Sequence, residues 1–185
     1  MDNSSYSADK FLSLLGQLSR KAIKNNTDVS ILLFGGGAMA LYYAARERTH
    51  DLDALLQGTS VSLVEQMVAD VAAEQGVRSD WLNDQGAKYI TSEMIDSSLD
   101  FIDLPGVKVK VANPEAMLAL KISAFRSELE APDEDDIRFL LGQLKIGDEQ
   151  SALAILEEYS PGRLASLTKY HIIRLRELIQ EVSGS

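Results

Sequence analysis

The sequence predicts an α+β fold, in which a mixed β-sheet is flanked by helices and followed by a helical carboxyl-terminal part. The apolar segment Val29–Phe34, typical of a buried strand, lies between segments whose apolar residues have helical spacing. Val107–Val111 alternates valine with lysine, as a half-exposed strand does. Beyond it the pattern is helical, so we expect an α/β core over residues 1–112 and a helical part over residues 113–185.

The first half of the chain alternates predicted helices and strands. The first helix, over residues 11–23, has apolar residues at intervals of three and four: Phe11, Leu14, Leu15, Leu18 and Ala22. Asn25 and Asn26 mark its end. The next elements are a strand over Val29–Phe34, three glycines at 35–37, a helix over 38–45, a strand over 49–56, and a helix over 61–75 that stops at Gly76.

The second half of the chain is mainly helical, although residues 80–98 have no clear pattern. The Asn-Pro-Glu sequence at 113–115 is typical of a helix start, and we expect this helix to end near residue 129. Another begins at Pro132, with the apolar stripe Ile137, Leu140, Leu141 and Leu144. Two more helices are expected over 149–159 and 163–182, separated by a Ser-Pro-Gly turn.

The amino-acid composition limits which metals and cofactors the protein could bind. The chain has no cysteine, which excludes disulfides, zinc-thiolate sites and iron–sulfur clusters, and only His50 and His171 offer imidazole. A metal would therefore bind carboxylates, which favours Mg²⁺ or Mn²⁺. The formal net charge of -10 repels polyanions, so RNA would need a local basic patch. We expect a cytoplasmic protein without membrane partners, because we find neither a signal-peptide pattern nor an apolar run of about 20 residues.

Two aspartates stand out in the predicted strand over 49–56. Alternation places Thr49, Asp51 and Asp53 on one side and His50 on the other. The two aspartate Cα atoms would lie roughly 6.6 Å apart, which lets both carboxylates reach one divalent cation. The alternative is a strand whose exposed face is simply acidic.

Three glycines precede the helix that leads to this strand. Glycine tolerates positive φ and close approach, so the backbone amides of Gly35, Gly36 and Gly37 could face a phosphate, or the glycines could form a tight turn packed against a neighbour. Arg48 and Thr49 stand just before the aspartate pair. Together, the amides, the cation and the two carboxylates indicate a nucleoside triphosphate site.

Three stretches of the chain resemble motifs of the nucleotidyltransferase superfamily, in particular the minimal nucleotidyltransferase-like proteins that include the AbiEii-like toxins of bacterial toxin–antitoxin systems. The stretches are FGGGAMALYYAARERTHDLDALL, VKVANPEAMLALKISAFR and PDEDDIRFLLGQL, and they span residues 31–144. The first resembles the family's glycine-rich turn and Asp-x-Asp strand. The second carries a helical lysine, Lys121, and the third resembles an Asp-x-x-Asp-Ile/Leu helix.

The resemblance implies roles for these residues. Asp51 and Asp53 would hold Mg²⁺ or Mn²⁺ on the triphosphate, with Lys121 contacting phosphates or the reacting group. Asp133 or Asp136 would act as a general base. The nucleotide would contact Gly35, Gly36, Gly37, Arg48, Thr49 and Lys121.

Taken without the resemblance, the same residues allow simpler roles. Lys121 lies in an almost wholly apolar helix, from which its ammonium would either extend to solvent or point into a site. Asp133 and Asp136 could simply compensate the amino-terminal end of their helix. Many relatives have a third metal-binding carboxylate on a neighbouring strand, a position that only Asp100 or Asp103 could take here.

We therefore expect a metal-dependent nucleotidyltransferase that moves a nucleoside monophosphate from a nucleoside triphosphate to RNA, protein or a small molecule, as a toxin restrained by an antitoxin protein. The alternatives are a catalytically weak interaction module and a structural domain with an accidental Asp-x-Asp. An antitoxin could bind an apolar stripe near the end of the chain, which otherwise packs on the protein's own core: Leu164, Leu167, Ile172, Leu175 and Leu178. RNA could bind basic clusters that otherwise are solvated helix faces: Arg20, Lys21, Lys24, Arg163, Lys169, Arg174 and Arg176.

Overall fold

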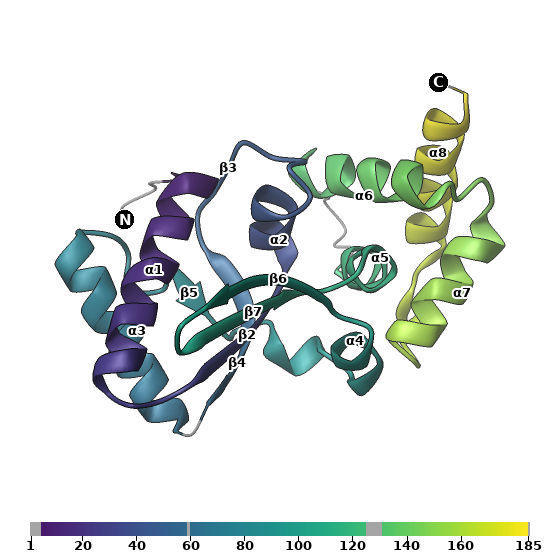
Figure 1. Ribbon diagram of the computed structural model, residues 1–185. Coiled ribbons are helices and arrows are strands. Elements are labelled where there is room, and N and C mark those ends of the chain that lie inside the picture. Colours follow the sequence, from purple (N-terminus) through teal and green to yellow (C-terminus); the bar gives the residue numbers. More distant parts are fainter. Residues whose placement is uncertain (1–4, 59, 125–130, 185) are drawn as a thin grey trace. The chain divides into compact units, whose positions relative to one another are not determined.

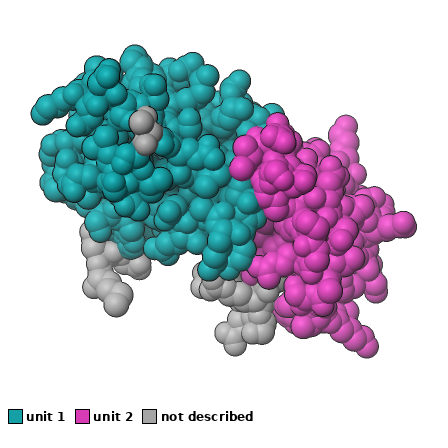
Figure 2. Space-filling view, turned by 90° about the horizontal axis from the view of Figure 1, so that it is seen from below, with its two compact units in different colours: residues 1–90, 98–112 teal, residues 91–97, 113–185 magenta. Residues whose placement is uncertain are grey.

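The computed structural model describes residues 5–58, 60–124 and 131–184, with the backbone alone for 131–132. These described residues form eight α-helices, a five-stranded mixed sheet and a two-stranded ribbon, which confirms the predicted α+β class. The chain divides into two compact units (Figure 2): residues 1–90 with 98–112, and residues 91–97 with 113–185.

The first unit is built on the five-stranded sheet (Figure 1), whose strand order is β5-β4-β2-β7-β6. The central strand β2 (Val29–Phe34) is buried except at Ser30. It pairs antiparallel with β4 (Leu52–Gly58) and parallel with β7 (Val107–Val111). The edges are β5 (Leu82–Asn83) and β6 (Leu99–Leu104). Burial on both faces therefore explains why every residue of β2 except Ser30 is apolar.

Helices α1 (Ala8–Lys24) and α3 (Val61–Gln75) lie side by side in this unit (Figure 1). Ser7 caps α1 by accepting a hydrogen bond from the Lys10 amide, and all five apolar positions predicted for this helix are fully buried. Helix α3 ends at Gly76, whose left-handed backbone confirms the expected stop.

Two predicted boundaries in the first unit are wrong. The strand expected over 49–56 is divided into β3 (Arg48–Thr49) and β4, because β3 pairs with β1 (Tyr6–Ser7) in the separate ribbon and the chain changes sheets at residues 50–51. The helix expected over 38–45 is α2 (Gly35–Leu41), so the three glycines are its first residues and do not precede it. The short η1 helix (Ala87–Tyr89) follows β5.

The second unit contains α4 (Ser92–Asp96), α5 (Pro114–Ser123), α6 (Ala131–Leu144), α7 (Glu149–Tyr159), η2 (Leu164–Ser166) and α8 (Lys169–Ser183). Helix α5 contacts both α6 and α7, and six of its ten residues are buried. Its cap, Asn113, accepts from the Ala116 amide at 2.7 Å and donates to the Tyr159 hydroxyl at 3.0 Å. The α4 segment joins this unit because Thr91 donates to the Tyr159 carbonyl and Met94 is fully buried.

Two helices of the second unit also differ from expectation. Helix α5 ends at Ser123, and residues 125–130 of the predicted helix lie outside the described residues. The single helix expected over 163–182 is divided into η2 and α8, because Leu167 is extended and Thr168 starts α8 with a reciprocal capping box to His171.

Candidate functional site

The glycines at the start of α2 allow close packing against β4. Gly35 has φ +64°, and a Cβ built there would lie 2.6 Å from the Asp53 Oδ2 atom. A Cβ on Gly37 would lie 2.7 Å from Leu52 Cδ2. The space that a side chain at position 35 would fill therefore holds the Asp53 carboxylate, and the glycines pack closely on β4 as the start of a helix and not as a turn.

Asp53 lies at the beginning of β4 and Asp51 just before it, beside the end of β2. Asp53 pairs in register with Phe34 on one side and with Asn83 of β5 on the other. Paired residues on adjacent strands project to the same face of a sheet, and the Asn83 amide nitrogen reaches the Asp51 carboxylate at 3.4 Å. The two aspartates and Asn83 thus share one face, although Asp51 itself precedes the strand.

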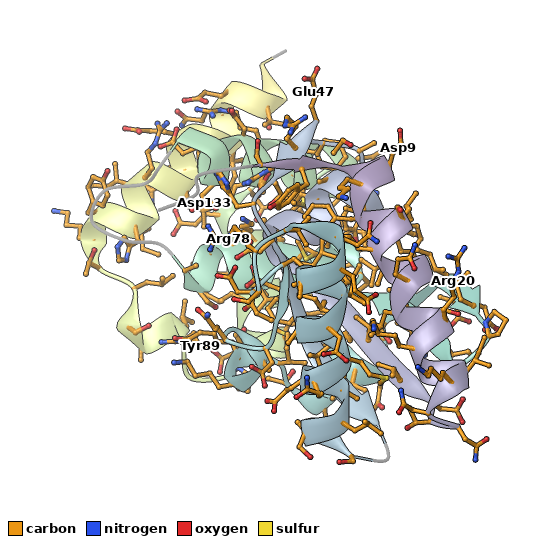
Figure 3. The ribbon with its side chains drawn as sticks, turned by 90° about the vertical axis from the view of Figure 1, so that its left-hand side faces the viewer. Asp9, Arg20, Glu47, Arg78, Tyr89 and Asp133 are labelled. Carbon is orange, nitrogen blue, oxygen red and sulfur yellow. The ribbon has the colours of Figure 1, made fainter. Side chains whose placement is uncertain are left out.

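The surroundings of Asp51 shift its acidity. Partial burial raises the pKa of its carboxyl, and the nearby charge of Asp80 raises it further. Arg78, His50 and the Asn83 amide oppose these effects without cancelling them. Arg78, labelled in Figure 3, instead binds both oxygens of Asp80 and lowers the pKa of that carboxyl. Asp51 is therefore a part-buried acid whose charged form is disfavoured, first by burial and second by the charge of Asp80.

The cation that lies against the glycines is Arg46. Its guanidinium NH1 would be 3.3 Å from a Cβ built on Gly36. Arg48, the cation selected from the sequence, donates through Nε to the Ser5 hydroxyl at 2.9 Å and through its NH2 group to the Ser5 carbonyl. Thr49 is buried, and its hydroxyl donates to the Asp51 carbonyl at 3.3 Å. Nothing in the spacing of the sequence separates Arg46 from Arg48.

The residues at this site fit a divalent metal ion as a two-carboxylate site. Asp51 and Asp53 supply hard oxygen donors, and Mg²⁺ commonly completes such a site with water and phosphate oxygens. Asp100 and Asp103 both lie on β6, three strands away from β4, which is roughly 14 Å across the sheet. Among the described residues, no three His, Cys, Asp or Glu side chains form a metal-binding group.

Lys121, Asp133 and Asp136 come together in the second unit. The Lys121 ammonium lies 2.7 Å from an oxygen of each aspartate. Lys121 is 8% exposed and Asp136 only 1% exposed. The lysine is thus held inside the unit by two carboxylates of α6, and it does not extend to solvent. The aspartates do more than start their helix, since they tie α6 to α5.

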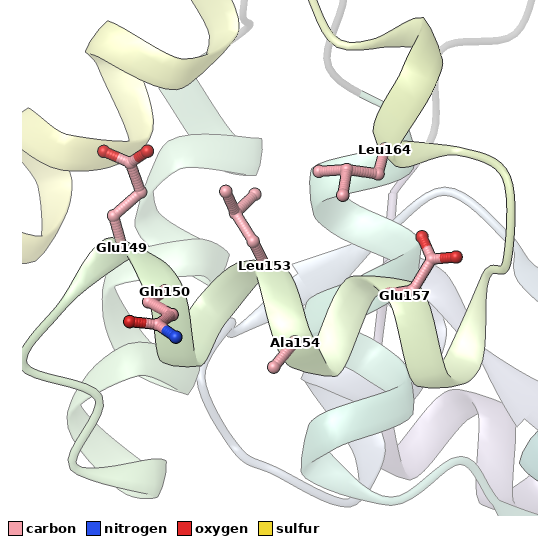
Figure 4. A pocket seen from close by; sticks show the side chains of 6 residues that line it. All are labelled: Glu149, Gln150, Leu153, Ala154, Glu157 and Leu164. Atoms are coloured by element: carbon pink, nitrogen blue, oxygen red, sulfur yellow. The ribbon is translucent and has the colours of Figure 1, made fainter.

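The apolar stripe predicted to bind a partner near the end of the chain is partly buried and partly exposed. Leu175 and Leu178 are fully buried within the unit, so most of α8's apolar stripe packs on the protein itself. Leu164 is 38% exposed and borders a groove of about 520 Å³ (Figure 4). The lining residues of the groove are Glu149, Gln150, Leu153, Ala154, Glu157 and Leu164.

Several cations of the predicted basic clusters are paired with acids. Lys21 binds Glu74 at 2.7 Å in the first unit. In the second unit Arg174 binds Glu134 at 2.5 Å and Arg176 binds Glu149 at 2.5 Å. These local carboxylates reduce the positive potential that RNA binding needs.

Comparison with models of known protein families, with curated proteins and with solved structures finds no match to this chain. In the part of the chain that the structure describes, every helix is too short or too polar to cross a bilayer. The site must therefore be interpreted from its own geometry.

Proposed function

We propose that the chain is a metal-dependent nucleotidyltransferase with a nucleotidyltransferase-like core, which moves a nucleoside monophosphate from a nucleoside triphosphate to an acceptor hydroxyl. The observation that carries this proposal is the convergence of Asp51 and Asp53 on one face, with the Asp53 carboxylate in the cradle left by Gly35. Arg46 lies against the next glycine and supplies a cation beside the carboxylate pair.

Each residue has a distinct part in this proposal. The aspartates would hold Mg²⁺ or Mn²⁺, which when bound neutralises phosphate charge and aligns the triphosphate. Arg46 would add positive charge against the phosphate oxygens, and Gly35 and Gly36 would leave room for them. Positioning and charge neutralisation account for much of the acceleration in phosphoryl transfer.

The proposed reaction is an in-line displacement at the α-phosphorus. A bond forms from the acceptor oxygen to phosphorus, the bond to the bridging oxygen breaks, and pyrophosphate leaves. The acceptor proton passes to solvent or to a basic group. We propose a structural role for Lys121, Asp133 and Asp136, because the lysine pairs with both aspartates.

Titration calorimetry with each nucleoside triphosphate and Mg²⁺ tests the proposal. Asp53→Asn should weaken metal-dependent binding by at least tenfold, because a neutral amide replaces a charged ligand. Asp103→Asn, an exposed aspartate on the edge strand β6, is the matched control and should bind like the wild type. Equal affinity in all three proteins would remove Asp53 from the site.

Incubation with labelled triphosphates and separated pools of RNA, protein and small molecules identifies the acceptor. Label in one pool that depends on Asp53 supports transfer to that class. Binding without transfer to any pool would favour the alternative, an interaction module, for which the groove beside Leu164 is the candidate surface for an antitoxin protein. Growth arrest by the wild type but not by Asp53→Asn in a bacterial host would support a toxic transferase.

A further inference from the structure

The turn over residues 81–86 is anchored firmly beside the site. Trp81 is fully buried, and its indole Nε1 donates to the Val68 carbonyl of α3 at 3.1 Å. The Trp81 carbonyl accepts from the Leu52 amide at 2.8 Å. These bonds attach the beginning of the turn both to a helix of the first unit and to the first residue of β4.

The other end of the turn packs on β2. A Cβ built on Gly86 would lie 2.6 Å from Phe34 Cε2, so glycine is needed for this contact. Phe34 is the register partner of Asp53. Both ends of the turn therefore rest on the strands that carry or adjoin the aspartate pair.

Asn83 is the last residue of β5, which begins this anchored segment, and its amide is oriented by its neighbours. The Gln85 backbone amide donates to the Asn83 Oδ1 atom at 3.2 Å. This bond turns the Nδ2 group toward the Asp51 carboxylate and the Asp80 carbonyl, each at 3.4 Å. A side-chain amide can bind an ionised carboxylate only through its nitrogen, so the orientation is the one that Asp51 requires.

We propose that Asn83 is a positioning residue for Asp51, which holds the Asp51 carboxylate on the face that it shares with Asp53. The proposal rests on the function proposed above, in which both carboxylates bind a divalent cation. Its basis is the contact between the Asn83 amide and a proposed metal ligand, since loss of a group that orients a metal ligand typically lowers metal affinity by about 10–100-fold.

Asp80 does not take over this role. Arg78 donates from Nε to one oxygen of Asp80 at 2.8 Å and from NH2 to the other at 2.5 Å. A carboxylate held at both oxygens by one guanidinium is a poor metal ligand. The Asn83 amide is neutral and adds no charge that would compete with the cation.

Mn²⁺ alone is a suitable probe, and its free concentration can be followed by electron paramagnetic resonance with the full chain. Asn83→Ala should weaken Mn²⁺ binding about tenfold, the loss of one hydrogen bond to a charged group. Gln85→Ala is the matched control in the same turn, because its side chain is exposed and its backbone amide still donates to Asn83. Circular dichroism of both variants should match that of the wild type.

A second measurement needs no variant of Asn83. In nitrogen-labelled wild type, substoichiometric Mn²⁺ should broaden the Asn83 side-chain amide resonances and leave those of Asn25, at the end of α1, sharp. Sharp Asn83 resonances in a protein that binds Mn²⁺ would place the ion away from Asp51 and overturn both the metal site and the positioning role. Wild-type affinity in folded Asn83→Ala, together with loss of binding in Asp51→Asn, would overturn the positioning role alone. Absence of Mn²⁺ binding by the wild type would overturn both.

Discussion

Replacing Lys121 with methionine should destabilise the second unit strongly. The side chain of Lys121 is 10% exposed and that of Asp136 is 2% exposed, and their charged atoms are 2.7 Å apart. Removing one partner of such a pair leaves an uncompensated buried charge, which costs about 3–5 kcal/mol. The contact with Asp133 adds little, because an acid that is 41% exposed contributes roughly 1 kcal/mol or less.

Urea unfolding, followed by circular dichroism, measures this loss. Lys169→Met, at an exposed position at the start of α8, is the matched control and should stay within about 0.5 kcal/mol of the wild type. The double variant Lys121→Met with Asp136→Leu removes both charges and should recover most of the loss, because an apolar pair replaces a buried ion pair at little cost. A Lys121→Met protein as stable as the wild type would refute the reasoning.

Three further predictions concern the first unit. Gly35→Ala and Gly76→Ala both place alanine at positive φ, which should lower the free energy of unfolding by about 1–2 kcal/mol. Only Gly35→Ala should also reduce Mn²⁺ binding, because its Cβ would collide with the carboxylate of Asp53. Equal Mn²⁺ affinity in the two variants would contradict this. Arg46→Gln should weaken triphosphate binding in calorimetry more than Arg48→Gln, and the reverse order would restore Arg48 to the site. Because the pKa of Asp51 is raised, Mn²⁺ affinity should begin to fall, as the pH is lowered, at a higher pH than an ordinary aspartate would give. The contribution of Asp51 to the stability of the fold should decrease as the pH rises through its raised pKa. Mn²⁺ affinity unchanged between pH values of about 7 and 4 would contradict the first expectation.

Much of the fold was predictable because burial imposes a period on the sequence. In α1 the five apolar positions at helical spacing are all fully buried. In β7 the valines are buried and both lysines are more exposed, as the alternation indicates. Elements of two residues, such as β3 and β5, are too short to show any period, which is why the change of sheet at residues 50–51 was not predicted.

The candidate site was only partly predictable, for a related reason. The Asp51 and Asp53 pair follows from local spacing, because the two residues are neighbours in sequence. The contacts of Asn83 depend on strand register, and the position of Arg46 depends on where the chain bends after α2. Lys121 meets carboxylates of another helix, and no spacing within its own helix indicates them. The surroundings of Asn83, Arg46 and Lys121 depend on contacts between different elements, which local spacing does not indicate.

Two sequestered aspartates, Asp136 and Asp51, differ in how their charges are compensated. Asp136 is almost fully buried and has the Lys121 ammonium at 2.7 Å, so its charge is compensated within the protein. Asp51 is half-buried beside Asp80, and Arg78 has its guanidinium on Asp80. The pKa of Asp51 is raised first by burial and second by the charge of Asp80, and Arg78 and His50 oppose these effects only in part. Under the proposed function, a divalent cation held by Asp51 and Asp53 would supply positive charge that favours the ionised form of Asp51.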